Sequence, residues 1–155
     1  RVKAIGAAFE EAGMHCIVSD NIMGVIWDKL LVNVATGAVC GITHLPYGDM
    51  YQEEKLVATA VAAVQEGMDV AAKAGVKLTY SNPMDVLELA RAGLPYDFKP
   101  SILQSLEKHR PTEVGVINGA VVTQGAKHGV PTPVNETLVA CVTGIERYIR
   151  EYINK

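Results

Sequence analysis

Apolar residues recur at helical spacing through most of this chain, and the spacing predicts its main elements. Residues 22–42 are apolar nearly all round, as expected for a central helix that other helices surround. Residues 53–74 repeat alanine and valine at helical spacing and stop before Gly75, which suits the position after a helix end. No segment shows the alternating pattern of a strand ladder, so the sequence predicts an all-α domain.

Prolines and glycines delimit the remaining elements. Proline at the first helical position and glycine after the last turn are common helix boundaries. On this basis the chain is expected to hold further helices over 1–13, 82–92, 100–109, 111–129 and 134–153. Residues 15–20 are expected to be extended and residues 44–50 to form a loop. We therefore predict a bundle of about six or seven helices.

Composition and charge restrict the partners. The 155 residues carry a net charge of -3 with scattered lysine and arginine, so the basic surface typical of nucleic-acid binding is missing. No apolar run is free enough of polar residues and glycine to suit a lipid bilayer, and the histidines lack metal-ligand spacing. Cys16, Cys40 and Cys141 are odd in number and far apart, which indicates free thiols. We expect a cytoplasmic protein that binds a small molecule, without nucleic acid, membrane or metal.

Three polar residues share one face of the predicted central helix. Lys29, Asn33 and Thr36 stand at positions i, i+4 and i+7, with Gly37 beside them. An unpaired buried ammonium is costly, so a lysine on a buried helix is solvated, paired or used. Two interpretations remain open. Either the three polar residues belong to a functional site, or Lys29 lies at an exposed edge and Asn33 is a hydrogen-bonded core amide.

Two further candidates lie between residues 99 and 119. Ser101 follows Pro100 in the first turn of a predicted helix, where free N–H groups and a hydroxyl suit a carboxylate or phosphate. The alternative is a serine that caps the helix. Glu113 falls in the first turn of the next predicted helix, where it either binds a ligand or only stabilises the helix. The aromatic residues, Trp27 and Tyr47 among them, are interpreted as packing groups.

Several short motifs are spaced along nearly the whole chain. They are A-G near residue 12, W-x-K-L-x-x-N at 27–33, E-x-x-x-x-A-x-x-A-G-V at 66–76, K-P-S-x-L-Q at 99–104, R-x-T-E at 110–113, I-N-G at 117–119 and G-V-P-T-P-x-N at 129–135. In this order they resemble the C-terminal domain of ketopantoate reductases (2-dehydropantoate 2-reductases). The implied fold is the helical bundle of ketopantoate reductase and 6-phosphogluconate dehydrogenase-like proteins.

The resemblance implies the NADPH-dependent reduction of ketopantoate to pantoate, on the pathway to pantothenate and coenzyme A. In that family a preceding Rossmann domain carries the cofactor. Residues 1–20 would then be the end of that domain and the link from it, and residues 21–155 the helical substrate-binding domain. No dinucleotide or phosphate-binding fingerprint occurs in the chain, so no cofactor-binding residue is assigned to it. The isolated chain is therefore expected to be inactive.

The resemblance also implies the roles of the candidate residues. Lys29 matches the general acid of the family, while Asn33, Ser101 and Glu113 match residues of the substrate pocket. A positioned ammonium suits this reaction because hydride transfer places negative charge on the carbonyl oxygen.

Two positions depart from the family pattern. Gly37 stands where many members have a second asparagine, and Ser105 replaces an acidic residue that often follows K-P-S-x-L-Q. One alternative is therefore a paralogue that reduces another small 2-oxo acid. Another is a non-catalytic helical interaction module. For the ketopantoate reductase and for the paralogue alike, a homodimer is expected, because the last predicted helix is mainly apolar.

Overall fold

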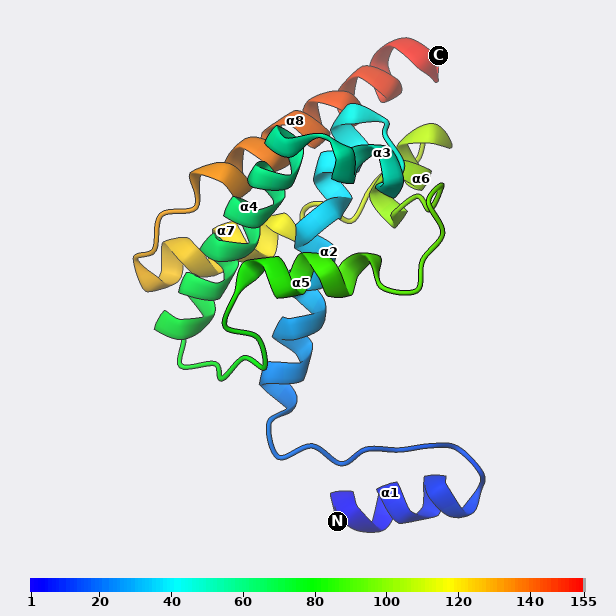
Figure 1. Ribbon diagram of the computed structural model, residues 1–155, viewed down its shortest axis with the longest axis vertical. Helices are drawn as coiled ribbons and strands as arrows, with labels where there is room; N and C mark the ends of the chain where they lie inside the picture. The colour runs from blue at the N-terminus through cyan, green and yellow to red at the C-terminus, as the bar shows by residue number, and fades with distance from the viewer. Residues whose placement is uncertain (155) are drawn as a thin grey trace.

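The computed structural model describes residues 1–154, and its regular elements in this range are all helical. They are α1 (Val2–Glu11), α2 (Ile22–Thr43), α3 (Tyr47–Gln52), α4 (Glu54–Lys73), α5 (Pro83–Arg91), α6 (Ser101–Glu107), α7 (Asn118–His128), α8 (Pro133–Tyr148) and a π-helical segment, η1 (Ile149–Ile153). Figure 1 shows α2 running through the middle of the bundle and η1 continuing α8 at its end. The prediction of an all-α domain is confirmed.

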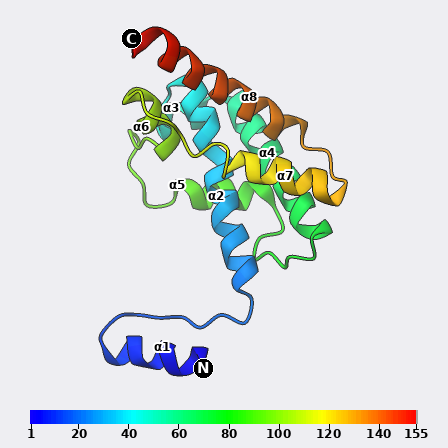
Figure 2. The same ribbon diagram turned by 180° about the vertical axis from the view of Figure 1, so that it is seen from behind.

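From Leu31 onward, α2 forms the centre of the core. Its buried apolar side chains in this stretch are Leu31, Val34, Ala35, Ala38, Val39 and Cys40. The helices α4, α5, α6 and α8 pack around it, as the view from behind also shows (Figure 2). Full burial of one leucine or valine contributes about 1.5–3 kcal/mol, so these contacts fix the position of α2 in the bundle.

The first turns of α2 are exposed instead. Ile22, Met23, Val25 and Ile26 each leave more than half of their surface to solvent. In both views α1 and the segment after it lie beyond this end of α2, away from the other helices (Figures 1 and 2). The prediction of a surrounded central helix therefore holds for the second half of α2 and is wrong for its beginning.

The length and composition of α2 would also allow it to cross a membrane. Ile22–Thr43 is the one helix of this kind within residues 1–154, and more than half of its most apolar stretch is buried by the neighbouring helices. A core helix meets the same criteria, because a helix surrounded by protein is apolar on all sides. This property of α2 is accounted for by its central place in the bundle.

Local backbone rules explain several boundaries. Gly75 and Gly93 each adopt a φ of +73° directly beyond α4 and α5, a conformation that glycine accepts without strain. The side chain of Asn82 caps α5 by accepting a hydrogen bond from the N–H of Met84, and Pro83 opens the helix as predicted. Here sequence and structure agree.

The loop expected over 44–50 is wrong, because α3 begins at Tyr47. The N–H groups of Tyr47 and Gly48 donate to the carbonyls of Phe98 and Tyr96, at 3.0 and 2.8 Å. These N–H groups belong to the first turn of α3 and have no partner inside the helix. The α5–α6 loop satisfies them, so α3 depends on a distant segment that local sequence does not reveal.

The helix expected over 111–129 begins only at Asn118. Ahead of it, Val116 and Ile117 donate to the carbonyl of Glu113, at 3.0 Å each, in a series of turns. The N–H of Thr112 donates to the Glu146 carboxylate of α8 at 2.6 Å. This contact with α8 holds the segment in turns, so the helical prediction from Pro111 is wrong.

Three of the sequence motifs meet in a buried polar cluster, formed by Glu66, Asn118 and Asn135. The Glu66 carboxylate of α4 accepts from the N–H of Val134 and Asn135, at 2.8 and 3.0 Å, and so caps the start of α8. The Asn135 amide donates to Glu66 at 2.8 Å and accepts from the Asn118 amide at 3.0 Å. The cluster joins α4, α7 and α8.

Candidate functional site

A cavity of about 260 Å³ opens beside the middle of α2. Its walls come from α2, α3, the end of α5, the α5–α6 loop, the start of α6 and the turn before α7. The lining residues are Val32, Asn33, Thr36, Gly37, Tyr47, Ala90, Leu94, Phe98, Pro100, Ser101, Ile102 and Ile117. Most of these side chains are apolar, so the few polar ones decide how a ligand would be oriented.

Two of the predicted site residues meet in this cavity. Asn33 comes from α2 and Ser101 from the first turn of α6. Both residues are exposed, and within residues 1–154 neither side chain makes a hydrogen bond. Asn33 is therefore not the hydrogen-bonded core amide of the alternative interpretation. Both groups are free to bind a ligand.

Lys29 stands one turn before Asn33 on the same face of α2. It is exposed and lines a shallow depression next to the cavity, with Val32 belonging to both. The neighbouring Asp28 carboxylate accepts from the N–H of Thr79, at 3.1 and 3.3 Å. In the described part of the chain Lys29 has no ion pair. Its ammonium is solvated, which agrees with the interpretation that Lys29 lies at an exposed edge of the helix.

Glu113 does not line the cavity. The residue is exposed and lies in the turns ahead of α7, so its predicted place in a first helical turn is wrong. Its carbonyl accepts from the N–H of Ile117, which forms part of the cavity wall. Glu113 is thus linked to the cavity through the backbone only.

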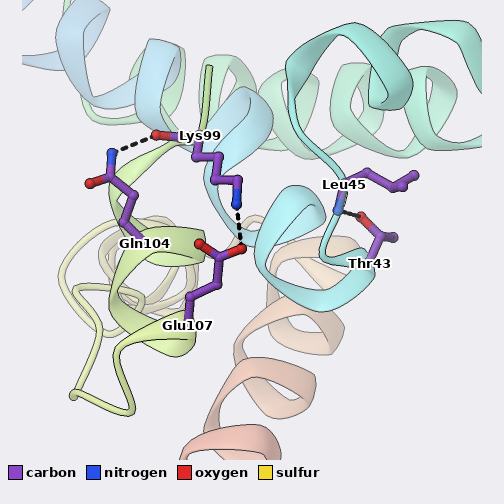
Figure 3. A network of polar contacts seen from close by, with 5 residues as sticks. All are labelled: Thr43, Leu45, Lys99, Gln104 and Glu107. Carbon is purple, nitrogen blue, oxygen red and sulfur yellow. Dashed lines mark hydrogen bonds and ion pairs between the residues drawn. The ribbon is translucent and has the colours of Figure 1, made fainter. Parts of the chain in front are cut away.

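The start of α6 excludes the interpretation of Ser101 as a helix cap. Pro100 occupies the N-cap position without a side-chain cap, so Ser101 is the first helical residue and does not cap the helix. Lys99 turns along α6, where its ammonium lies 2.6 Å from the Glu107 carboxylate and its carbonyl accepts from Gln104 at 2.7 Å (Figure 3). Lys99 is therefore paired away from Ser101, and Ser101 contributes a hydroxyl without a charged neighbour on its own helix.

A buried hydroxyl pair lies in the wall of the cavity. Thr36 Oγ1 and Tyr47 Oη are 2.6 Å apart, and both residues are almost fully buried. The Tyr47 ring packs edge-on against Phe98, with a centroid distance of 4.9 Å. Burial raises the pKa of the Tyr47 hydroxyl above its ordinary value, and the hydrogen bond with Thr36 opposes this shift only in part. The sequence alone indicates a packing role for Tyr47, because the pattern around residues 44–50 does not predict the helix that presents it.

Gly37 both lines the cavity and lets two helices approach. A Cβ atom at this position would lie 3.1 Å from Cδ1 of Ile102 on α6. One turn later, a Cβ at Gly41 would lie 2.7 Å from Cγ2 of the same side chain. Close packing of α2 on α6 therefore offsets the cost of two helical glycines, about 0.5–1 kcal/mol each. Gly37 and Ile102 both line the cavity, so this helix contact forms part of its wall.

A protein family matches most of the chain. The family described as ketopantoate reductase PanE/ApbA C terminal matches residues 21–146. The chain belongs to the ketopantoate reductase family. The all-helical bundle agrees with this membership, and the resemblance of the motifs is confirmed.

Curated relatives of the chain carry the name 2-dehydropantoate 2-reductase. The one from Archaeoglobus fulgidus is 31% identical over 142 residues, which are 92% of this chain and 47% of that protein. The one from Halobacterium salinarum is 32% identical over 149 residues, or 95% of this chain and 48% of that protein. The chain thus spans about half the length of the relatives it matches.

Solved structures share the fold. A PanE/ApbA family ketopantoate reductase from Ralstonia eutropha superimposes with a TM-score of 0.85 at 32% identity, over 96% of this chain and 49% of that one. D-mandelate dehydrogenase, solved with NADH and anilino(oxo)acetate, gives a TM-score of 0.83 at 27% identity, over 96% of this chain and 62% of that one. The bundle therefore occurs in enzymes named for different substrates.

Proposed function

We propose that this chain is the C-terminal substrate-binding domain of an NADPH-dependent 2-dehydropantoate 2-reductase, which reduces ketopantoate to pantoate in the cytoplasm. Residues 21–155 would form this domain, and residues 1–20 would end a cofactor-binding domain and link the two. The observation that carries the proposal is the shared cavity of Asn33 and Ser101, one helical turn from Lys29, in a chain of this family.

The position of Lys29 suits a general acid. Bound NADPH would supply the hydride, which leaves negative charge on the substrate oxygen. The Lys29 ammonium would stabilise this charge and transfer a proton to the oxygen. Because Lys29 is exposed, the resulting amine can recover its proton directly from water. The exposed face of α2 also leaves an approach for a cofactor held on another domain.

Asn33 and Ser101 would hold the oxygens of the 2-oxo acid. The Asn33 amide can donate to the carbonyl or carboxylate oxygen, and the Ser101 hydroxyl can donate to the carboxylate. Neither group has to leave an existing partner first. Glu113 remains a candidate through the family motif R-x-T-E, with a place near the wall that Ile117 forms.

A paralogue that reduces another small 2-oxo acid is the second candidate. Two features favour it: Gly37, which the resemblance contrasts with an asparagine in many family members, lines the cavity, and most of the cavity wall is apolar. D-mandelate dehydrogenase shows that the same bundle occurs in an enzyme named for an aromatic substrate. The homodimer also remains a prediction.

The test is the reduction of 2-oxo acids by the full-length protein that contains this chain. We expect NADPH oxidation with ketopantoate at a kcat/KM well above that for pyruvate and phenylpyruvate. A higher kcat/KM for one of the other acids would favour the paralogue. No oxidation with any 2-oxo acid would contradict the enzymatic function altogether.

A further inference from the structure

The Thr36–Tyr47 pair holds one hydroxyl proton more than its own hydrogen bond uses. Each hydroxyl can donate once, and a single bond joins the two. Whichever of the two donates in that bond, the proton of the other needs an acceptor. Among residues 1–154 neither Thr36 nor Tyr47 makes a further side-chain hydrogen bond. One donor of the pair is therefore unused.

A comparison with other helical threonines supports the conclusion that one hydroxyl donor of the pair is unused. Thr43 donates to the carbonyl four residues earlier at 2.8 Å, and Thr59, Thr123 and Thr137 do the same. Thr36 does not form the corresponding bond, because its hydroxyl lies against Tyr47. The Thr36 hydroxyl therefore lacks the hydrogen bond to the preceding turn that these other threonines form.

The position of the pair makes the unused donor relevant to a ligand. Thr36 is 1% and Tyr47 7% exposed, and both residues line the cavity that Asn33 and Ser101 share. A buried donor without an acceptor costs about 1–3 kcal/mol, which a ligand oxygen in the cavity would offset. The raised pKa of Tyr47 keeps its hydroxyl protonated, and hence able to donate, through the neutral range.

We propose that the Thr36–Tyr47 pair is a substrate-binding element that donates a hydrogen bond to the hydroxyl group of the substrate. The proposal rests on the proposed function, because ketopantoate carries a hydroxymethyl group in addition to its 2-oxo acid. Lys29, Asn33 and Ser101 provide partners for the carbonyl and carboxylate. Glu113 does not line the cavity, so the Thr36–Tyr47 pair provides the remaining polar groups of the cavity wall for the substrate hydroxyl.

The spacing along α2 fits this assignment. Thr36 lies about one turn beyond Asn33, which corresponds to a rise of roughly 5 Å. In ketopantoate the hydroxyl oxygen is separated from the keto carbon by three bonds, a length of similar order. A substrate with its carbonyl near Lys29 and Asn33 can therefore reach the pair with its hydroxyl.

The test compares two substrates that differ only in the hydroxyl. Ketopantoate and 3,3-dimethyl-2-oxobutanoate, its analogue without the hydroxyl, are reduced by the full-length enzyme and its Tyr47→Phe variant. We expect the variant to lose about five- to tenfold in kcat/KM for ketopantoate, the effect of one hydrogen bond, and to keep its kcat/KM for the analogue. In the variant Thr36 can donate to the preceding turn, as other helical threonines do.

Tyr51→Phe is the matched control. The Tyr51 hydroxyl donates to the carbonyl of Leu87 at 2.6 Å, and the residue does not line the cavity. This variant should leave the ratio of kcat/KM for the two substrates unchanged. Thr36→Ser, which keeps the hydroxyl, should also retain the ratio. In Thr36→Val the Tyr47 hydroxyl keeps its own proton and loses its partner, so it can still donate and the ratio should change little.

The outcomes separate this inference from the proposed function. Turnover of both substrates with an equal loss for both in Tyr47→Phe, or with no loss, would overturn the role of the pair and leave the reductase intact. Failure of the unaltered enzyme to reduce either substrate would overturn the proposed function and the inference with it. If Tyr47→Phe does not fold, the unaltered enzyme decides: equal kcat/KM values for ketopantoate and for the analogue without the hydroxyl overturn the inference.

Discussion

Asn33 and Ser101 come from distant parts of the sequence and line one cavity, each with a side chain that has no hydrogen-bond partner within residues 1–154. Both residues are exposed, so a ligand in the cavity would displace only water from these two groups and break no contact within the described residues.

Replacement of Lys29 by alanine in the full-length enzyme should lower kcat by roughly 10² to 10⁴, the usual effect of losing a general acid. The KM for NADPH should change little. Steady-state kinetics under saturating cofactor measure both values. Lys73→Ala, at an exposed lysine that lines none of the described cavities, is the control. A kcat within a factor of two of that of the unaltered enzyme would show that Lys29 is not the general acid.

Asn33→Ala and Ser101→Ala should each weaken substrate binding by removing one hydrogen-bond donor. Bonds to a charged carboxylate contribute about 1.5–3 kcal/mol, so we expect KM to rise by roughly 10- to 100-fold. The two effects should not add in the double variant, since both groups hold the same small molecule. A strictly additive double variant would indicate that the two residues contribute to substrate binding independently of each other.

The isolated chain should not turn over ketopantoate with NADPH, because it lacks a phosphate-binding loop and with it the source of hydride. The rate of NADPH oxidation in a mixture of the isolated chain and ketopantoate measures this turnover. The full-length enzyme at equal molar concentration is the positive control. Turnover by the isolated chain would mean that it binds the cofactor by itself.

Gly37→Asn should sharpen the preference for ketopantoate over bulkier 2-oxo acids by about 1 kcal/mol in kcat/KM, through one added hydrogen bond and the loss of space. The new Cβ would meet only the flexible end of Ile102, so the fold should tolerate it. Kinetics on a panel of 2-oxo acids test this. Equal changes for every acid, with lower thermal stability, would assign Gly37 to helix packing alone.

Cys40 should resist a thiol reagent that modifies Cys141. Burial raises the pKa of the Cys40 thiol to about 12, while Cys141 is exposed on α8. Mass spectrometry after treatment at mildly alkaline pH should find Cys141 modified and Cys40 unmodified until the chain unfolds. Because the folded pKa exceeds the unfolded value of 9.0, this group favours folding below that pH, and its contribution is lost as pH rises toward about 12.

The sequence predicted features that local rules control. Gly75, Gly93 and Asn82 act through their own backbone or the next few residues, so their positions at helix ends could be predicted without tertiary information. The long helix α2 also has a strong periodic pattern. These elements together set the helical class of the fold.

Features that depend on distant contacts could not be predicted in this way. The first turn of α3 is held by the carbonyls of Tyr96 and Phe98, and the delayed start of α7 follows from a bond between Thr112 and Glu146. The exposure of Lys29 depends on which helices cover α2. The same limit concealed the hydroxyl pair, because Thr36 and Tyr47 meet only after α3 has formed.

The polar cluster of Glu66, Asn118 and Asn135 has a consequence for reading related sequences. None of these side chains lines the cavity, yet three of the motifs by which the chain is assigned to its family run through them. Another chain that shares only those motifs would inherit the same junction of α4, α7 and α8, and nothing in that junction selects a ligand. Substrate assignments within this family should therefore be read from the positions equivalent to Asn33, Gly37, Tyr47 and Ser101, where two enzymes with the same scaffold can diverge.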